Sequence, residues 1–167
     1  MNGVQAMQAA FAGAHNWFSG TVADVSDEQS KSVPPGVVHP IGELAAHVLH
    51  TEDGILAMIQ GKPPIWEAEG YGAKLGLAMM AMHDTMGARS YMVNVGDLAE
   101  YQQKVFASTN AYVASLTEAD LDGEIELFGS KHKLGDFLTG ILLGNTYVHT
   151  GEISALKGLH GAKGYPF

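Results

Sequence analysis

The stretch of sequence that decides the fold is LGDFLTGILLGNTYVHTGEISALKGLHG, residues 134–161. Its apolar residues recur at intervals of three and four, which is the spacing of one face of an α-helix. On a helical wheel at about 100° per residue, that face carries Leu134, Leu138, Ile141, Leu142, Val148, Leu156 and Leu159. The pattern predicts one long amphipathic helix over residues 134–159, which closes at Gly161.

Three polar residues interrupt the apolar face of this helix. Asn145, His149 and Glu152 fall in the middle of the face at spacings of four and three, so their side chains stack on adjacent turns. Burying a polar group without a partner costs about 1–3 kcal/mol. The three groups must therefore be hydrogen-bonded, bound to a metal or open to a cavity.

Three further segments, roughly residues 4–25, 40–60 and 97–116, have the same helical spacing. Pro40 suits the first turn of the second helix, and Asp97 with Glu100 has capping-box spacing at the start of the third. Residues 125–128 alternate apolar and acidic side chains, which predicts a brief extended segment or hairpin. Four amphipathic helices predict an all-α four-helix bundle in a single domain, residues 1–167.

Residues 61–96 have the weakest pattern, because glycines and methionines are scattered through them. A short extra helix is expected over residues 74–89. The methionines suit adaptable packing. Alternatively, this long connection forms a flexible lid or pocket wall with Trp66 and Tyr71 as contacts.

Composition excludes several classes of protein. Of 167 residues, 46% are hydrophobic and 16% charged, which is enough apolar material for a core. The chain has no run of about 18 apolar residues, so no membrane span is expected, and its start does not resemble a signal peptide. The absence of cysteine excludes thiolate sites and is compatible with the cytoplasmic location that we expect. A net charge of −9 disfavours binding to nucleic acid.

The second helix offers partners for the polar stack. His47 lies at the edge of its apolar stripe and Glu52 lies within the stripe, whereas His50 points nearly opposite and is expected to be solvated. One interpretation is a buried hydrogen-bond network that fixes the register of the helices. The other is a metal site with open positions, which polarises a substrate or activates water. The remaining histidines suggest packing, helix-entry or loop positions; they are His15, His39, His83, His132 and His160.

Two segments resemble the signature motifs of the DinB/YfiT-like superfamily. The first is PIGELAAH at residues 40–47, preceded by Pro-Pro-Gly at 34–36 and followed by Thr51-Glu52. The second is Asn145-x-x-x-His149-x-Gly-Glu152-Ile, where the family signature usually reads His-x-x-x-His-x-Gly-Gln-Ile. The two motifs occur in the family's order and the resemblance spans nearly the whole chain.

The resemblance implies an up-down-down-up four-helix bundle that is often homodimeric. The long segment 61–96 agrees, since parallel second and third helices need a long return. Members of the family commonly bind nickel or zinc through three histidines, whose positions here are His47, Asn145 and His149. Some relatives are S-transferases or isomerases that use mycothiol, bacillithiol or glutathione.

Asn145 departs from the family pattern, because an amide oxygen is a weak ligand for nickel or zinc. Glu152 or Glu52 would then have to complete the site. Glu152 could also orient the imidazole of His149, or form a simple ion pair with it in the absence of metal.

Two hypotheses follow. The first is a metal-dependent enzyme that transfers, isomerises or hydrolyses a small molecule, with His47, Asn145 and His149 as metal ligands and with Glu152 and Glu52 as catalytic carboxylates. The second is a degenerate, metal-free homodimeric module that binds a ligand or serves as structure. In that module the side chains at positions 47, 145, 149 and 152 form a polar network.

Overall fold

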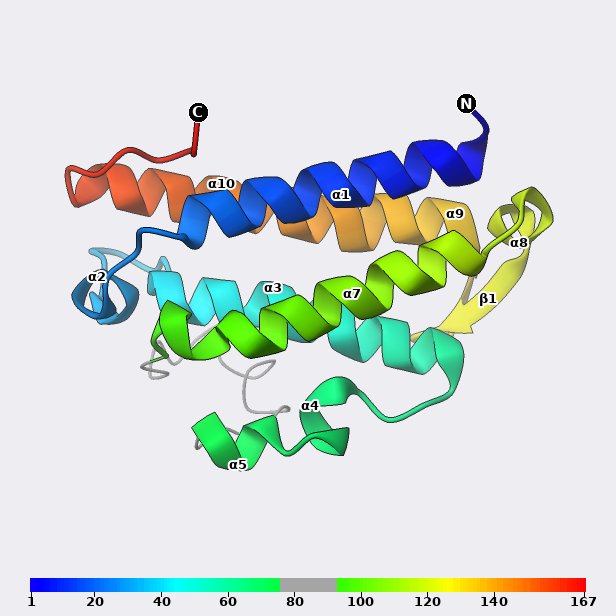
Figure 1. Ribbon diagram of the computed structural model, residues 1–167, viewed down its shortest axis with the longest axis horizontal. Coiled ribbons are helices and arrows are strands. Elements are labelled where there is room, and N and C mark those ends of the chain that lie inside the picture. Colours follow the sequence, from blue (N-terminus) through cyan, green and yellow to red (C-terminus); the bar gives the residue numbers. More distant parts are fainter. Residues whose placement is uncertain (76–92) are drawn as a thin grey trace.

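The computed structural model describes residues 1–75 and 93–167, and four long helices form its body (Figure 1). They are α1 (Gly3–Val22), α3 (Ile41–Gln60), α7 (Ala99–Ser115) and a last helix made of α9 (Leu134–Phe137), the π turn η3 (Leu138–Leu143) and α10 (Gly144–Leu159).

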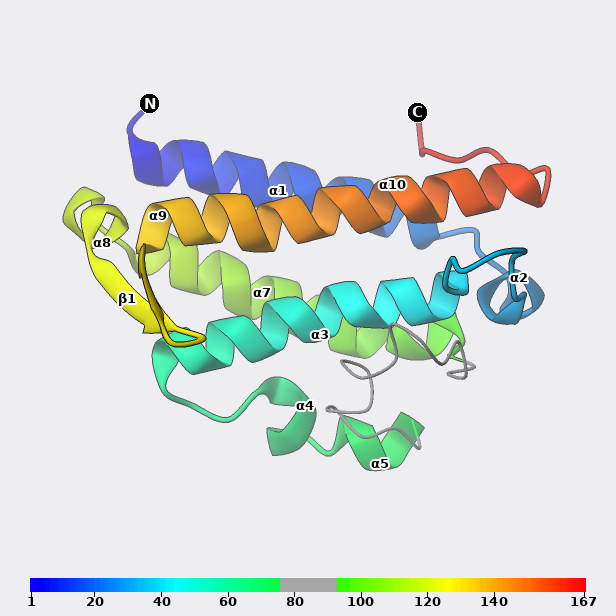
Figure 2. The same ribbon diagram turned by 180° about the vertical axis from the view of Figure 1, so that it is seen from behind.

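The four helices pack in two layers. Helices α1 and α10 form one layer and α3 and α7 the other, and α10 also contacts α3 while α1 contacts α7 (Figures 1 and 2). The first and last helices run in one direction, and α3 and α7 run in the opposite direction. The predicted all-α bundle with up-down-down-up topology is therefore confirmed.

Short elements connect the long helices. They are α2 (Asp27–Lys31), α4 (Ile65–Ala68), α5 (Tyr71–Leu75), the 3₁₀ turn η2 (Val95–Leu98), α8 (Glu118–Asp122), and the strands β1 (Glu124–Leu127) and β2 (Ser130–Lys133). The two strands pair antiparallel, which confirms the hairpin predicted around residues 125–128. Apart from α5, the helix expected over residues 74–89 lies outside the described residues, as do the methionines between 79 and 92.

The capping box predicted at Asp97 is wrong. Asp97 lies inside the 3₁₀ turn η2, and α7 begins at Ala99 without a side-chain cap. An N-cap residue needs an extended backbone before the first helical residue, and a helical turn in front of α7 removes it. The Glu100 side chain instead accepts a hydrogen bond from the hydroxyl of Tyr71 at 2.8 Å.

A buried carboxylate fixes the α4 segment to the bundle. Asp53 accepts hydrogen bonds from the backbone N–H groups of Ile65 and Trp66, both at 2.9 Å, and from the hydroxyl of Tyr101 at 2.8 Å. Burial, followed by the charge of Asp53, strongly raises the pKa of Tyr101, so this phenol remains a neutral donor. Trp66 and Tyr71 are each 2% exposed and pack around Tyr101. They belong to the core, and neither lines the pocket described below.

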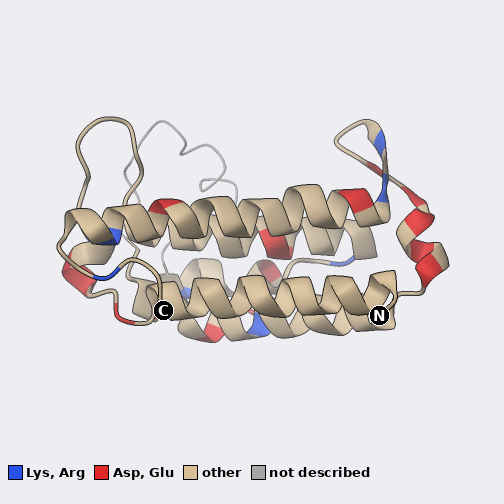
Figure 3. Cartoon of the chain, turned by 90° about the horizontal axis from the view of Figure 1, so that it is seen from above, with Lys and Arg blue, Asp and Glu red and all other residues tan. Residues whose placement is uncertain are grey.

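Charge is unevenly distributed over the bundle (Figure 3). Helix α1 contains no Asp, Glu, Lys or Arg, whereas α8 and the hairpin carry both signs, with Lys131 paired to Glu124 and Lys133 paired to Asp122. Although α1 is uncharged, no helix in residues 1–75 and 93–167 is both long and apolar enough to cross a membrane.

Gly42 marks the tightest backbone contact of α3. A Cβ atom at this position would lie 1.8 Å from the carbonyl oxygen of Val93 and 3.1 Å from that of Ser30. We expect Gly42→Ala to lower the free energy of unfolding by about 2 kcal/mol or more, because backbone must move to relieve the overlap. Urea unfolding followed by circular dichroism measures this.

Gly158→Ala is the matched control, because Gly158 lies in α10 and no other described side chain comes within 4 Å of the place that a Cβ atom would take. Alanine favours a helix over glycine by about 0.8–1 kcal/mol, so this variant should be as stable as the wild type or more stable. Equal stability of the two variants would contradict the described contact between α3 and Val93.

Candidate functional site

One π turn determines which side chains of the last helix face the core. A π turn holds an extra residue, so the residues after Leu138–Leu143 are rotated by about 100° from their positions on a straight α-helix. Val148 and Leu159, predicted to be buried, are 61% and 72% exposed, while Thr146 and Ile153 are buried. Beyond the π turn, the predicted apolar face is therefore correct for Leu156, which is buried, and wrong for Val148 and Leu159.

The same rotation moves the polar stack from the middle of the core face to its flank. Asn145 and His149 are half-buried and Glu152 is exposed. Their flank meets α3, where the ring centroids of His149 and His47 lie 4.8 Å apart at an interplanar angle of 86°. The structure thus brings His149 against His47, and His47 and Asn145 line one groove between α3 and α10.

Each imidazole has a neighbour that can orient it. Nδ1 of His149 lies 2.6 Å from Oε2 of Glu152, the distance of a charge-assisted hydrogen bond. Nε2 of His47 lies 3.5 Å from the hydroxyl oxygen of Thr51, one turn further along α3. Glu152 is therefore placed to hold the ring of His149, whereas Thr51 restrains His47 only weakly.

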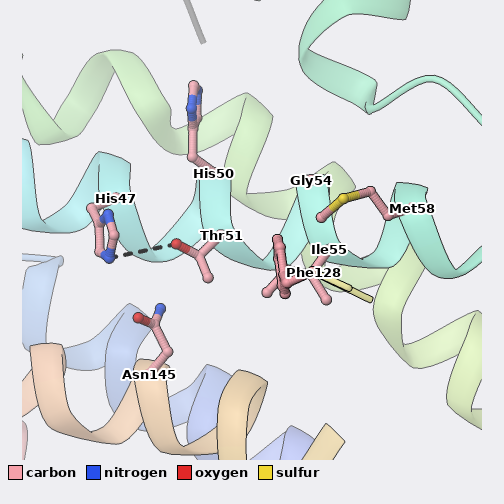
Figure 4. Close-up of a pocket in the computed structure, with 8 residues that line it drawn as sticks. All are labelled: His47, His50, Thr51, Gly54, Ile55, Met58, Phe128 and Asn145. Atoms are coloured by element: carbon pink, nitrogen blue, oxygen red, sulfur yellow. Dashed lines mark hydrogen bonds between the residues drawn. The ribbon is translucent and has the colours of Figure 1, made fainter. Parts of the chain in front are cut away.

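The groove contains a pocket of about 560 Å³. It has a polar end, where Asn145 faces His47 and Thr51, and an apolar end near the tip of the hairpin (Figure 4). The lining residues are His47, His50, Thr51, Gly54, Ile55, Met58, Phe128 and Asn145.

Two imidazoles fit a divalent metal ion by distance. A ring nitrogen binds zinc at about 2.0–2.1 Å, so two rings on one ion have centroids about 4.5–5.2 Å apart. The separation of 4.8 Å between the ring centroids of His47 and His149 falls within this range, and it is also the separation of an edge-to-face ring contact. In the part of the chain that the structure describes, no three His, Cys, Asp or Glu side chains form such a group, so the third ligand would be the amide of Asn145.

Comparison with known proteins identifies the family of this chain. The profile of the DinB superfamily matches residues 10–153, which include α3 and the part of α10 that carries Asn145, His149 and Glu152. The chain belongs to the DinB superfamily. The crystal structure of a conserved protein from Enterococcus faecalis superposes with a TM-score of 0.79 over 95% of this chain and 97% of that chain. The two sequences are 16% identical, so this likeness shows the fold alone. No curated protein matches the chain.

Glu52 of this DinB protein does not reach the groove. It is 1% exposed and points into the centre of the bundle, where its Oε1 lies 2.9 Å from Nε2 of His15 and accepts a hydrogen bond from Thr109 at 2.5 Å. The ring of His15 stacks on Phe106 at a centroid distance of 3.8 Å. The described hydrogen-bond partners of Glu52 thus lie on α1 and α7. This carboxylate links three helices in the interior of the bundle.

The prediction that His50 is solvated is wrong. His50 is fully buried, with its ring centroid 3.9 Å from that of Trp66, and it points away from Asn145 (Figure 4). Helix α3 is covered on this side by α4, a segment whose packing the periodicity of α3 alone does not reveal.

Several residues that line the pocket carry no ionisable group, and the sequence did not single them out. Gly54, Ile55 and Met58 continue the flank of α3 that begins with His47, and Phe128 reaches the pocket from the hairpin turn. The spacing of four residues from His47 to Thr51, and of three and four from Thr51 to Gly54 and Ile55, is the signal that could have found the α3 residues.

A substitution of Glu52 tests whether its buried hydrogen bonds stabilise the fold. We expect Glu52→Ala to lower the free energy of unfolding by about 2–4 kcal/mol, because His15 and Thr109 lose a buried acceptor. Thermal or urea unfolding measures the loss. Glu126→Ala, which removes an exposed carboxylate from β1, is the control and should change stability by less than about 0.5 kcal/mol. A Glu52→Ala protein as stable as the control would contradict the buried network.

Proposed function

We propose that this DinB protein is a divalent-metal-dependent enzyme that acts on a small molecule by transfer, isomerisation or hydrolysis. The observation that carries the proposal is the pair of imidazoles, His47 and His149, whose rings lie 4.8 Å apart. His47 lines the polar end of a pocket of about 560 Å³ together with Asn145. Pockets of about 300–1,000 Å³ are typical of small-molecule sites.

The ion would be nickel or zinc and would be held by His47, His149 and the amide oxygen of Asn145. A bound divalent ion supplies Lewis-acid chemistry, through which a substrate oxygen is polarised or a water or thiol loses its proton more easily. Imidazole nitrogens suit both metals, whereas an amide oxygen is a poorer ligand, so binding should be weaker than at a site with three histidines.

Glu152 acts in this proposal as a positioning residue. Its carboxylate accepts the hydrogen bond from Nδ1 of His149, which leaves Nε2 of the same ring with the lone pair that a metal needs. Outer partners of this kind typically change metal affinity about 10–100-fold when they are removed. At His47, the separation of 3.5 Å from Thr51 makes a weak hydrogen bond that a ligand can replace.

A metal-free binding module is the second candidate function. The observation that favours it is Asn145, which stands where a third nitrogen ligand would be, together with the absence of a three-membered His, Cys, Asp or Glu group in residues 1–75 and 93–167. In that case the polar end would bind a substrate group directly, by hydrogen bonds from the amide of Asn145 and from His47.

Asn145→His distinguishes the two candidates. We expect the metal-free wild type to bind Zn²⁺ or Ni²⁺ weakly in isothermal titration calorimetry, and the variant to bind at least tenfold more tightly, because a third imidazole replaces an amide. His47→Ala and His149→Ala should each abolish binding in the wild-type background. His160→Ala removes an exposed imidazole beyond α10 and is the matched control, which should leave the affinity unchanged.

Each binding result supports or contradicts one of the two candidate functions. Weak binding by the wild type that depends on both groove histidines supports the enzyme. Binding by Asn145→His alone supports the metal-free module. Failure of both proteins to bind, with Zn²⁺ and with Ni²⁺, would contradict a metal site in this groove.

A further inference from the structure

The hairpin end of the groove is apolar. Ile55 and Met58 of α3 and Phe128 of the hairpin turn lie together there, beside Gly54, and Asn145 and His47 lie toward the opposite end (Figure 4). Of the described residues that line the pocket, none is Asp, Glu, Lys or Arg. A ligand that fills the pocket therefore meets polar groups at one end and hydrocarbon at the other.

Phe128 adopts a backbone conformation that its side chain does not favour. Its φ angle is +53° and that of Gly129 is +74°, as in the two-residue turns that usually hold asparagine, aspartate or glycine. The side chain is 71% exposed, so little burial offsets the unfavourable backbone. The turn does not account for an aromatic residue at this position, whereas a role in the pocket does.

The hairpin holds the ring of Phe128 in place. Strands β1 and β2 pair in register from Glu124 opposite Lys133 to Leu127 opposite Ser130, and Leu127 is buried. The ring of Phe128 also stacks on that of Phe137 in α9, with centroids 6.5 Å apart. Phe128 thus forms a wall at the end of the groove.

We propose that this protein takes an amphipathic substrate, whose polar head binds near His47 and Asn145 and whose apolar tail lies against Ile55, Met58 and Phe128. Phe128 is then a specificity-determining residue that sets how much tail the groove accepts. The assignment of the head to a metal rests on the proposed function, whereas the assignment of the tail rests on the apolar lining and on the position of Phe128.

A series of probes with one head and increasing tail length tests the inference. The probes are straight-chain hydroxamic acids from acetohydroxamic to octanohydroxamic acid, whose head chelates divalent metals, and the matching primary amides, which do not chelate. Their affinities are measured by calorimetry with Zn²⁺-loaded and with metal-free protein. We expect each added methylene to tighten binding about three- to fourfold until the tail fills the groove.

The test variant is Phe128→Asn, because asparagine suits a positive φ and should keep the hairpin at least as stable. Its unfolding midpoint is measured first to verify this. We expect it to bind octanohydroxamic acid at least tenfold more weakly than the wild type and acetohydroxamic acid equally well. Phe167→Asn is the matched control, since Phe167 is 68% exposed and does not line the pocket; it should behave as the wild type.

Each outcome bears on one part of the account. A gain with tail length that Phe128→Asn reduces supports the inference, even when Zn²⁺ makes no difference, in which case the proposed metal function fails instead. Affinity that is independent of tail length, or a gain that Phe128→Asn leaves intact, would overturn the inference even when the hydroxamate head binds in a metal-dependent way.

Discussion

The extra residue in the π turn Leu138–Leu143 sets the direction of every side chain that follows it in the last helix. After this turn in the chain, Thr146 and Ile153 face the core. The hydroxyl of Thr146 donates a hydrogen bond to the carbonyl oxygen of Leu142 at 3.1 Å. Asn145 and His149 are consequently turned to the groove beside α3. A helix without this turn would direct them elsewhere, and π turns are frequent at functional sites.

The polar groups in the interior of the bundle link its helices, whereas those at the groove are accessible to a ligand. In the interior, Glu52 with His15 and Thr109, and Asp53 with Tyr101, link α3 to its neighbours through hydrogen bonds. At the groove, His47 and His149 are only partly covered, so a ligand can reach them. A half-buried position costs less desolvation than a core position, and it lets the imidazoles exchange one partner for another.

The sequence predicted the helices well, because each carries an apolar stripe, and α3 and α10 end near glycine, at Gly61 and Gly161. The motifs also identified the residues that meet across the groove, His47 and His149. Periodicity failed where a local irregularity or a distant segment decides the outcome: the π turn changed the buried face of the last helix, and Trp66 covered His50. The sequence did not reveal that Glu52 contacts His15 and Thr109, because a helical wheel gives the direction of a side chain but not its partners on other helices. A bound metal, a homodimer and a cytoplasmic location remain predictions.

The metal-dependent function that we propose requires His47 and His149 to bind one divalent ion together. An anomalous-difference map from crystals soaked in Zn²⁺ or Ni²⁺, recorded on both sides of the metal absorption edge, tests it most directly. The account predicts a peak about 2.1 Å from one ring nitrogen of each histidine and within reach of the amide oxygen of Asn145. A groove without a peak at saturating metal, or a peak bound only by exposed histidines such as His160, would contradict it.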